Sequence, residues 1–240
     1  MKIFNQRERK MFNKFCAVLL GIGMIFIAGC KYETISNIYV VDINEIQTTG
    51  KGVTLESMIK IEMPNRDVFQ ENKAKIKNLL TPYFDVIGDL HCEDSDMFPK
   101  AVAKVNIPLI SERGSAPQKE FMHFIIRNKQ KFPGFGTGTQ VAVQFNSERF
   151  QQFQSAIESE FFDTVDPGEF KLNLILHNDQ KQPIDVMIAS SYVDGEPVHL
   201  TKVVNLKKRK SVNIVYSKIF MESTITKSGN AMFIIKDQQS

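Results

Sequence analysis

The sequence predicts an α+β fold, with one or more largely antiparallel sheets and two main helices. Several segments alternate between apolar and polar residues, as strands with one buried face do. Two other segments carry apolar residues at helical spacing, each directly after an asparagine that can cap a helix. The links between strands are mostly too short for the crossovers that parallel strands require, which favours antiparallel pairing.

The first half of the chain carries the clearest strand, residues 53–63, in which apolar and polar side chains alternate over eleven positions. Pro64 ends this strand, and Asn65 or Asp67 supplies the capping oxygen of a helix. The expected order is a polar tether at 31–36, a β-segment at 38–43, the strand at 53–63, the helix up to about Leu80, and strands at 83–91 and 101–109.

The second half repeats this order. Asn146 or Ser147 caps a second helix, in which Phe150, Phe153 and Phe161 fall at the spacing of a core-facing stripe. Asp194-Gly195 is a two-residue hairpin signal. The expected strands are 141–145, 170–176, 184–193, 198–206, 212–216 and 232–235, while residues 121–126 fit a helix or a strand equally well.

The order strand, asparagine cap, helix, strand, strand therefore occurs twice, near residues 53–109 and near residues 140–189. This repetition suggests an internal duplication of one unit. Residue identity between the two copies is slight, and α+β proteins often show this order by chance. Duplication and chance repetition both stay open at the level of sequence.

The N-terminal residues have the layout of a secretory signal. An apolar run of 14 residues lies at 15–28. Five Lys or Arg residues and a single acid, Glu8, precede it. A membrane-spanning helix needs about 20 residues, so this run has the length of a signal core instead. The alternative is an uncleaved N-terminal anchor.

The apolar run ends in Phe26-Ile27-Ala28-Gly29-Cys30, which resembles the lipobox of bacterial lipoproteins. The resemblance implies cleavage between Gly29 and Cys30, a diacylglycerol thioether on the Cys30 sulfur, and an acylated amino terminus, with membrane lipid as the partner. Two or more acyl chains hold a protein firmly on a bilayer. Lys31 follows the cysteine, and in enterobacterial lipoproteins the absence of aspartate there implies the outer membrane, with the body facing the periplasm.

Loss of residues 1–29 would change the charge and cysteine content of the chain. It would leave 25 basic and 26 acidic side chains, so the positive net charge of the whole chain, +3, comes from the leader, and we expect no nucleic-acid partner. Cys92 would be the one unmodified cysteine, which excludes an internal disulfide framework.

The domain organisation follows from these features. We expect a signal peptide at 1–29, an N-terminal α+β unit at 30–112, a connector at 113–139, and a β-rich C-terminal α+β unit at 140–240, and the two units can form one domain.

The sequence offers no motif for a catalytic site, a metal site or a cofactor. Residues 91–96, His-Cys-Glu-Asp-Ser-Asp, lack the ligand spacing of zinc or calcium sites, so a polar loop is the simpler interpretation.

The glycine-rich run at 134–138 is interpreted as a connector, with a partner-binding loop as the alternative. The basic run at 207–210 is interpreted as a turn between strands, with contact to lipid phosphates as the alternative. His91, His123, His177 and His199 are scattered along the chain.

Residues 29–33 (Gly-Cys-Lys-Tyr-Glu), the β-segment after them and the strand end at 59–64 resemble a group of uncharacterised lipoproteins of phages and prophages of Gram-negative bacteria. That group supplies no catalytic residues. We therefore expect a membrane-anchored, non-enzymatic periplasmic binding or interaction module, with an envelope protein as a further partner. One alternative is an envelope hydrolase acting on cell wall or lipid, which would gather the histidines with acids. The other is a structural subunit of an envelope assembly, which would expose an apolar patch or a free sheet edge.

Overall fold

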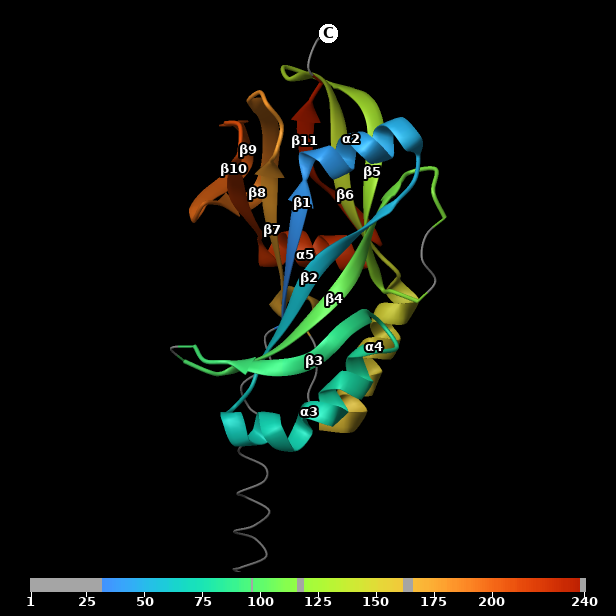
Figure 1. Ribbon diagram of the computed structural model, residues 1–240, viewed down its shortest axis with the longest axis vertical. Coiled ribbons are helices and arrows are strands. Elements are labelled where there is room, and N and C mark those ends of the chain that lie inside the picture. The colour runs from blue at the N-terminus through green and yellow to red at the C-terminus, as the bar shows by residue number, and fades with distance from the viewer. Residues whose placement is uncertain (1–31, 96, 116–118, 162–165, 238–240) are drawn as a thin grey trace, which may run out of the picture.

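Strands dominate the protein, and helices pack around them. The computed structural model describes residues 32–95, 97–115, 119–161 and 166–237 (Figure 1). The elements are β1 (Tyr32–Tyr39), α2 (Val40–Thr49), β2 (Val53–Glu62), α3 (Arg66–Leu80), β3 (Asp85–Glu93), β4 (Lys100–Ser111), β5 (Met122–Phe132), β6 (Gly136–Phe145), α4 (Ser147–Phe161), a short 3-10 turn (Pro167–Glu169), β7 (Phe170–Asn178), β8 (Ile184–Val193), β9 (Glu196–Leu206), β10 (Lys210–Tyr216), α5 (Lys218–Thr226) and β11 (Gly229–Lys236). The mixed α+β class is thus confirmed.

All the described strands belong to one sheet, and most of that sheet closes on itself. The strand order is β10-β7-β1-β2-β4-β5-β6-β11-β8, and β8 also pairs with β10, so these nine strands form a closed barrel. β9 extends from β8, and β3 extends from β4. Only β1–β7 and β4–β5 pair in parallel among the described strands, which confirms the largely antiparallel arrangement. The sequence did not predict the closure.

The two long helices begin at the asparagines expected from the sequence. Asn65 Oδ1 accepts a hydrogen bond from the Val68 amide at 2.8 Å, and Asn146 Oδ1 accepts one from the Arg149 amide at 3.1 Å. Each cap satisfies an amide that has no partner within the first helical turn. These interactions fix where α3 and α4 begin.

α3 and α4 lie side by side at one end of the sheet (Figure 1). A group of aromatic side chains fills the space between α4 and the sheet, with Phe121 at its centre and fully buried. Its ring contacts six others, those of Tyr83, Phe84, Phe145, Phe150, Phe153 and Phe170. α2 crosses the sheet at the opposite end of β1. No helix among the described residues is both long and apolar enough to span a membrane.

Two predictions near the N-terminus were wrong. The stretch expected to be a polar tether at 31–36 contains most of β1, whose side chains at Tyr32, Thr34, Ser36 and Ile38 are buried. The small hydroxyl residues hid this alternation. The β-segment expected at 38–43 ends at Tyr39, and α2 follows, burying three apolar residues that lie three positions apart: Val40, Ile43 and Ile46.

The glycine-rich run predicted as a connector is largely strand. Its first residues form a turn, and β6 begins at Gly136. β6 packs closely against β11 at Gly138, where a Cβ would lie 2.7 Å from both Ile234 Cγ2 and the Ile235 carbonyl oxygen. The glycine is therefore required for packing between strands. α5, at Lys218–Thr226, was missed altogether because it is only nine residues long.

The two repeated units pair their strands differently. In the first, β2 and β3 both pair with β4. In the second, β6 and β8 both pair with β11, and β7 pairs with β1 and β10. Strands from both halves of the chain thus belong to one sheet, in which β1, β2 and β4 of the first half lie next to one another.

Candidate functional site

β8 bends sharply at Ser190. Its Val186–Ile188 segment pairs with β11, and its Ser191–Val193 segment pairs with β10. Between them Ser190 has a φ of 49°, and the register with β9 shifts between Ala189 and Ser191. A left-handed conformation costs a non-glycine residue about 1–2 kcal/mol, and a bulge of this kind bends a strand. The bend lets β8 change partners and close the barrel.

A cavity of about 420 Å³ lies beside this bend, between the β8–β9 hairpin and α5. Its size falls within the range of small-molecule sites. Its polar lining comes from hydroxyl, amide and imidazole groups: Ser190, Ser191, Tyr192, His199, Ser217, Ser223 and Asn230. Its apolar lining comes from Pro197, Val198, Ile219 and Phe220. No Asp, Glu, Lys or Arg of the described chain lines it.

Ser191 is one of the residues that line this cavity, and its hydroxyl is unsatisfied. The residue is 3% exposed, and its Oγ is buried with no hydrogen-bond partner among the described residues. An unpaired buried polar group costs about 1–3 kcal/mol, so each one in a folded protein needs an explanation. Since Ser191 lines the cavity, a bound ligand can supply the missing partner.

Tyr216, opposite Ser191 in the β8–β10 pairing, has a second such hydroxyl. Burial raises the pKa of the Tyr216 phenol well above its usual value, so the group stays neutral. Its ring packs against Phe220, with the ring centroids 4.4 Å apart. Phe220 in turn lines the cavity, and the amide of Phe220 donates to Ser217 Oγ at 3.2 Å, which caps α5. The cap fixes the position of the apolar wall.

The comparisons with known proteins identify the family of this fold. A family model described as a domain of unknown function, DUF7424, matches residues 33–240. The chain belongs to the DUF7424 family. Comparison with curated proteins and with solved structures gave no significant match.

The residues predicted for lipid attachment, Gly29 and Cys30, lie outside the described residues and before the matched DUF7424 segment. The stretch at 91–96 covers the end of β3 and part of the turn after it, except for Asp96, which also lies outside the described residues. Glu93 pairs with Lys60, and Asp94 with Arg66. The described part of the chain holds no group of three potential metal ligands.

The four histidines of the DUF7424 domain lie on four different strands, β3, β5, β7 and β9. His123 Nε2 lies 3.2 Å from Gln144 Oε1, and His177 Nε2 lies 2.9 Å from Asn37 Oδ1. His177 also stacks on Tyr39, with the ring centroids 4.6 Å apart. His199 is the member of this set that lines the cavity.

The cavity at Ser190 and Ser191 was not predicted, although the sequence placed both serines within the sheet. A signal for the bend was present. Ile184, Val186 and Ile188 are buried at even positions, whereas Val193 is buried at an odd one. Because side chains alternate strictly along a strand, a change from even to odd indicates an interruption of the regular strand between these positions.

Proposed function

We propose that the protein is a lipid-anchored lipoprotein of the bacterial envelope, whose DUF7424 domain binds an uncharged ligand rich in hydroxyl groups. The observation that carries the binding proposal is Ser191, a residue that lines a cavity of about 420 Å³ and whose buried hydroxyl has no partner in the described chain. The domain would act as a binding module on the periplasmic side of the outer membrane.

The anchor is supported by the layout of the N-terminus. The matched family segment starts at residue 33 and β1 starts at Tyr32, so the lipobox-like residues directly precede the folded domain. A signal sequence that is cleaved before Cys30 would leave that domain intact. At about 0.8 kcal/mol per buried CH₂, two acyl chains would hold it on the membrane. The resemblance to phage lipoproteins stays a prediction, for which neighbouring genes are the test.

The composition of the cavity favours an uncharged ligand. A charged ligand would lose its hydration without meeting a carboxylate, ammonium or guanidinium group, since no Asp, Glu, Lys or Arg is among the described lining residues. Hydroxyl and amide groups beside Phe220 suit a sugar, which presents hydroxyl groups at its edge and C–H groups on its face. In the envelope, this chemistry corresponds to a neutral glycan.

The same lining argues for binding rather than hydrolysis. His199 is accompanied by serines but by no acid among the described lining residues. A serine nucleophile is normally activated by a base that a third group orients, and no orienting group faces His199 in this cavity.

The anchor is tested by replacing the lipidated cysteine. Cys30→Ala should abolish labelling by radioactive palmitate and keep the leader attached. In detergent phase partitioning, a larger fraction of the variant than of the parent should enter the aqueous phase. Cys92→Ala, which changes the half-buried cysteine of β3, is the matched control and should be labelled normally. Equal labelling of Cys30→Ala and the parent would refute the anchor.

The binding site is tested by a pair of serine variants. Ser191→Ala should weaken binding of an N-acetylglucosamine tetramer or of maltotetraose by about 3- to 10-fold, the value of one neutral hydrogen bond. Ser57→Ala is the matched control, because Ser57 is also buried but its Oγ already bonds Ser36 Oγ at 2.9 Å, away from the cavity. Absence of binding by the parent protein to either sugar would exclude this ligand class.

A second function, assembly with another envelope protein, is favoured by the free edge of β9. β9 ends the strand order, and its side chains Leu200 and Val203 are 82% and 54% exposed. Exposed apolar edge strands readily pair with another chain. A photo-crosslinking residue at Leu200 should then capture a discrete partner in cells, whereas the same residue at exposed Val41 on α2 should not. Equal capture at both positions would contradict assembly through β9.

A further inference from the structure

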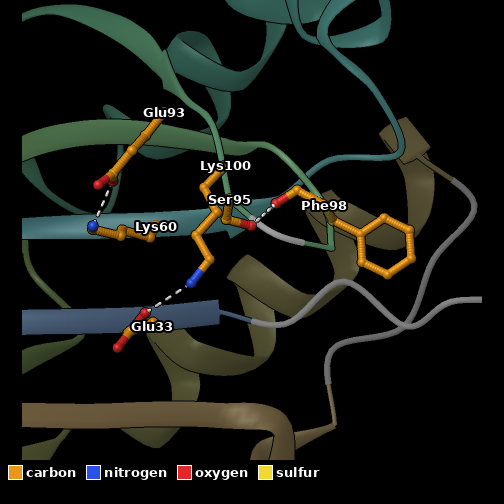
Figure 2. Close-up of polar contacts among 6 residues, drawn as sticks. All are labelled: Glu33, Lys60, Glu93, Ser95, Phe98 and Lys100. Carbon is orange, nitrogen blue, oxygen red and sulfur yellow. Dashed lines mark hydrogen bonds and ion pairs between the residues drawn. The ribbon is translucent and has the colours of Figure 1, made fainter.

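The turn between β3 and β4 carries two apolar side chains at its tip. Met97 is 82% exposed and Phe98 is 37% exposed. Ser95 Oγ donates to the Phe98 carbonyl oxygen, which holds the turn together. In Figure 2, the Phe98 ring projects away from the polar contacts beside it.

This turn lies at the end of the sheet where β1 begins. Tyr32 pairs with Ile61 of β2, and Ile61 pairs with Ala101 of β4, so Tyr32 and Ala101 are two strand spacings apart, about 10 Å. Phe98 lies three residues before Ala101 and extends up to about 10 Å beyond it. Cys30 lies two residues before Tyr32, which limits its distance from Tyr32 to about 7 Å. Phe98 and Cys30 can therefore lie at similar distances, about 10 Å and about 7 Å, beyond the same end of the sheet.

Three ion pairs lie around the turn among the described residues. Lys60 pairs with Glu93, Lys100 Nζ lies 3.3 Å from Glu33 Oε2, and Arg66 Nη2 lies 2.7 Å from Asp94 Oδ2. Figure 2 shows the first two pairs beside the turn; each joins strands that are two apart in the sheet, β2 with β3 and β1 with β4. Placing paired charges in the polar headgroup layer costs less free energy of desolvation than placing unpaired charges there. The apolar side chains of Met97 and Phe98 lie at the tip of the turn, beyond these pairs.

The basic run at 207–210, by contrast, lies at the other end of β1. Ser211 pairs with His177, and His177 pairs with Tyr39, the last residue of β1. The eight residues of β1 extend over about 23 Å. A membrane attached near Tyr32 therefore lies far from this basic run.

We propose that Met97 and Phe98 insert into the lipid surface beside the acyl chains of Cys30, so that the domain is held in one orientation with its basic turn pointing away from the bilayer. This inference rests on the proposed anchor. The partner is the lipid bilayer itself, because a tether of two residues keeps this end of the sheet against it.

The chain contains no tryptophan, so a single introduced one reports its own surroundings. Phe98→Trp, lipidated and reconstituted in vesicles of phosphatidylcholine and phosphatidylglycerol, should emit at shorter wavelength than the same variant in its unlipidated Cys30→Ser form. Its emission should also be quenched when the acyl chains carry bromine. Lys208→Trp, in the exposed basic turn, is the matched control and should show neither effect.

The outcomes separate the two proposals. If lipidated Phe98→Trp protein does not float with the vesicles, the anchor is wrong. If it floats but its emission is not quenched, the anchor stands and insertion of the turn is refuted. Quenching of Lys208→Trp instead of Phe98→Trp would show that the opposite end of the sheet faces the membrane.

Discussion

Ser191 on β8 and Tyr216 on β10 are opposite one another across paired strands, and each has a buried hydroxyl with no hydrogen-bond partner in the described chain. Two such groups at one pair position are costly, because each loses its hydrogen bonds to water. They stand where β8 leaves β11 and joins β10 to close the barrel. The cavity therefore adjoins the junction that completes the fold.

Removal of the Tyr216 hydroxyl should not destabilise the protein. Tyr216→Phe keeps the ring that packs on Phe220 and removes a group that has no partner, so we expect a gain of about 1 kcal/mol in the free energy of unfolding. Urea unfolding at pH 7 measures this change. Ser57→Ala, which leaves Ser36 without its bond, should instead lose about 1 kcal/mol. A loss of stability in Tyr216→Phe would indicate an unrecognised partner for its hydroxyl.

Tyr216 should also make the protein sensitive to alkali. Burial raises the pKa of its phenol above the usual value of 10.0, so above pH 10 the unfolded chain releases a proton that the folded chain retains. Stability is fully present below pH 10 and falls above it, by up to about 1.4 kcal/mol per pH unit for this group. Tyr216→Phe should therefore lose less stability than the parent between pH 9 and pH 11. Identical slopes for the two proteins would contradict this assignment.

His123 should give the opposite dependence in acid. Burial lowers the pKa of its imidazole below the usual value of 6.5, with Gln144 partly opposing the shift. The unfolded chain therefore takes up a proton more readily, so stability is present above pH 6.5 and falls as the pH drops below it. His123→Gln should reduce the loss of stability between pH 7 and pH 5. At pH 8 the imidazole is neutral in both states, so a difference seen there reports packing alone.

The Asn65 cap should contribute measurably to α3. Asn65→Ala leaves the Val68 amide without its acceptor and should cost about 1 kcal/mol of unfolding free energy. Asn65→Gly should cost only a few tenths of that amount, since glycine is itself tolerated at this position. Asn146→Ala at the start of α4 should behave like Asn65→Ala. An equal loss in Asn65→Ala and Asn65→Gly would argue against a role for the side-chain oxygen.

Phe121 should be the most costly aromatic side chain to truncate in its cluster. It is fully buried and touches six rings, so Phe121→Ala should cost about 3–5 kcal/mol. Phe161→Ala is the comparison, because Phe161 is only half-buried and its ring contact is with Lys75, at 4.8 Å. If Phe121→Ala does not fold, Phe121→Leu should still show the larger loss. A smaller loss for Phe121→Leu than for Phe161→Ala would contradict the central position of Phe121.

The candidate site shows where sequence reasoning stopped. The sequence placed Ser190 and Ser191 in a strand and identified the Asp194-Gly195 hairpin, and both hold in β8 and β9. The bend was missed, although the change from even to odd buried positions between Ile188 and Val193 signalled it. The cavity itself could not be predicted from the sequence, because α5, a separate segment of the chain, contributes Phe220 to its lining.

Short-range patterns determined the elements of this protein. Alternation over residues 53–63, the caps at Asn65 and Asn146, and the turn at Asp194-Gly195 each act over a few residues, so they are readable in the chain itself. The tertiary structure alone decided that β1 pairs with β7 across 138 positions of sequence, and that β8 closes the barrel onto β10. Such pairings depend on complementarity between distant surfaces, which leaves no local signature, and they create the cavity beside Ser191.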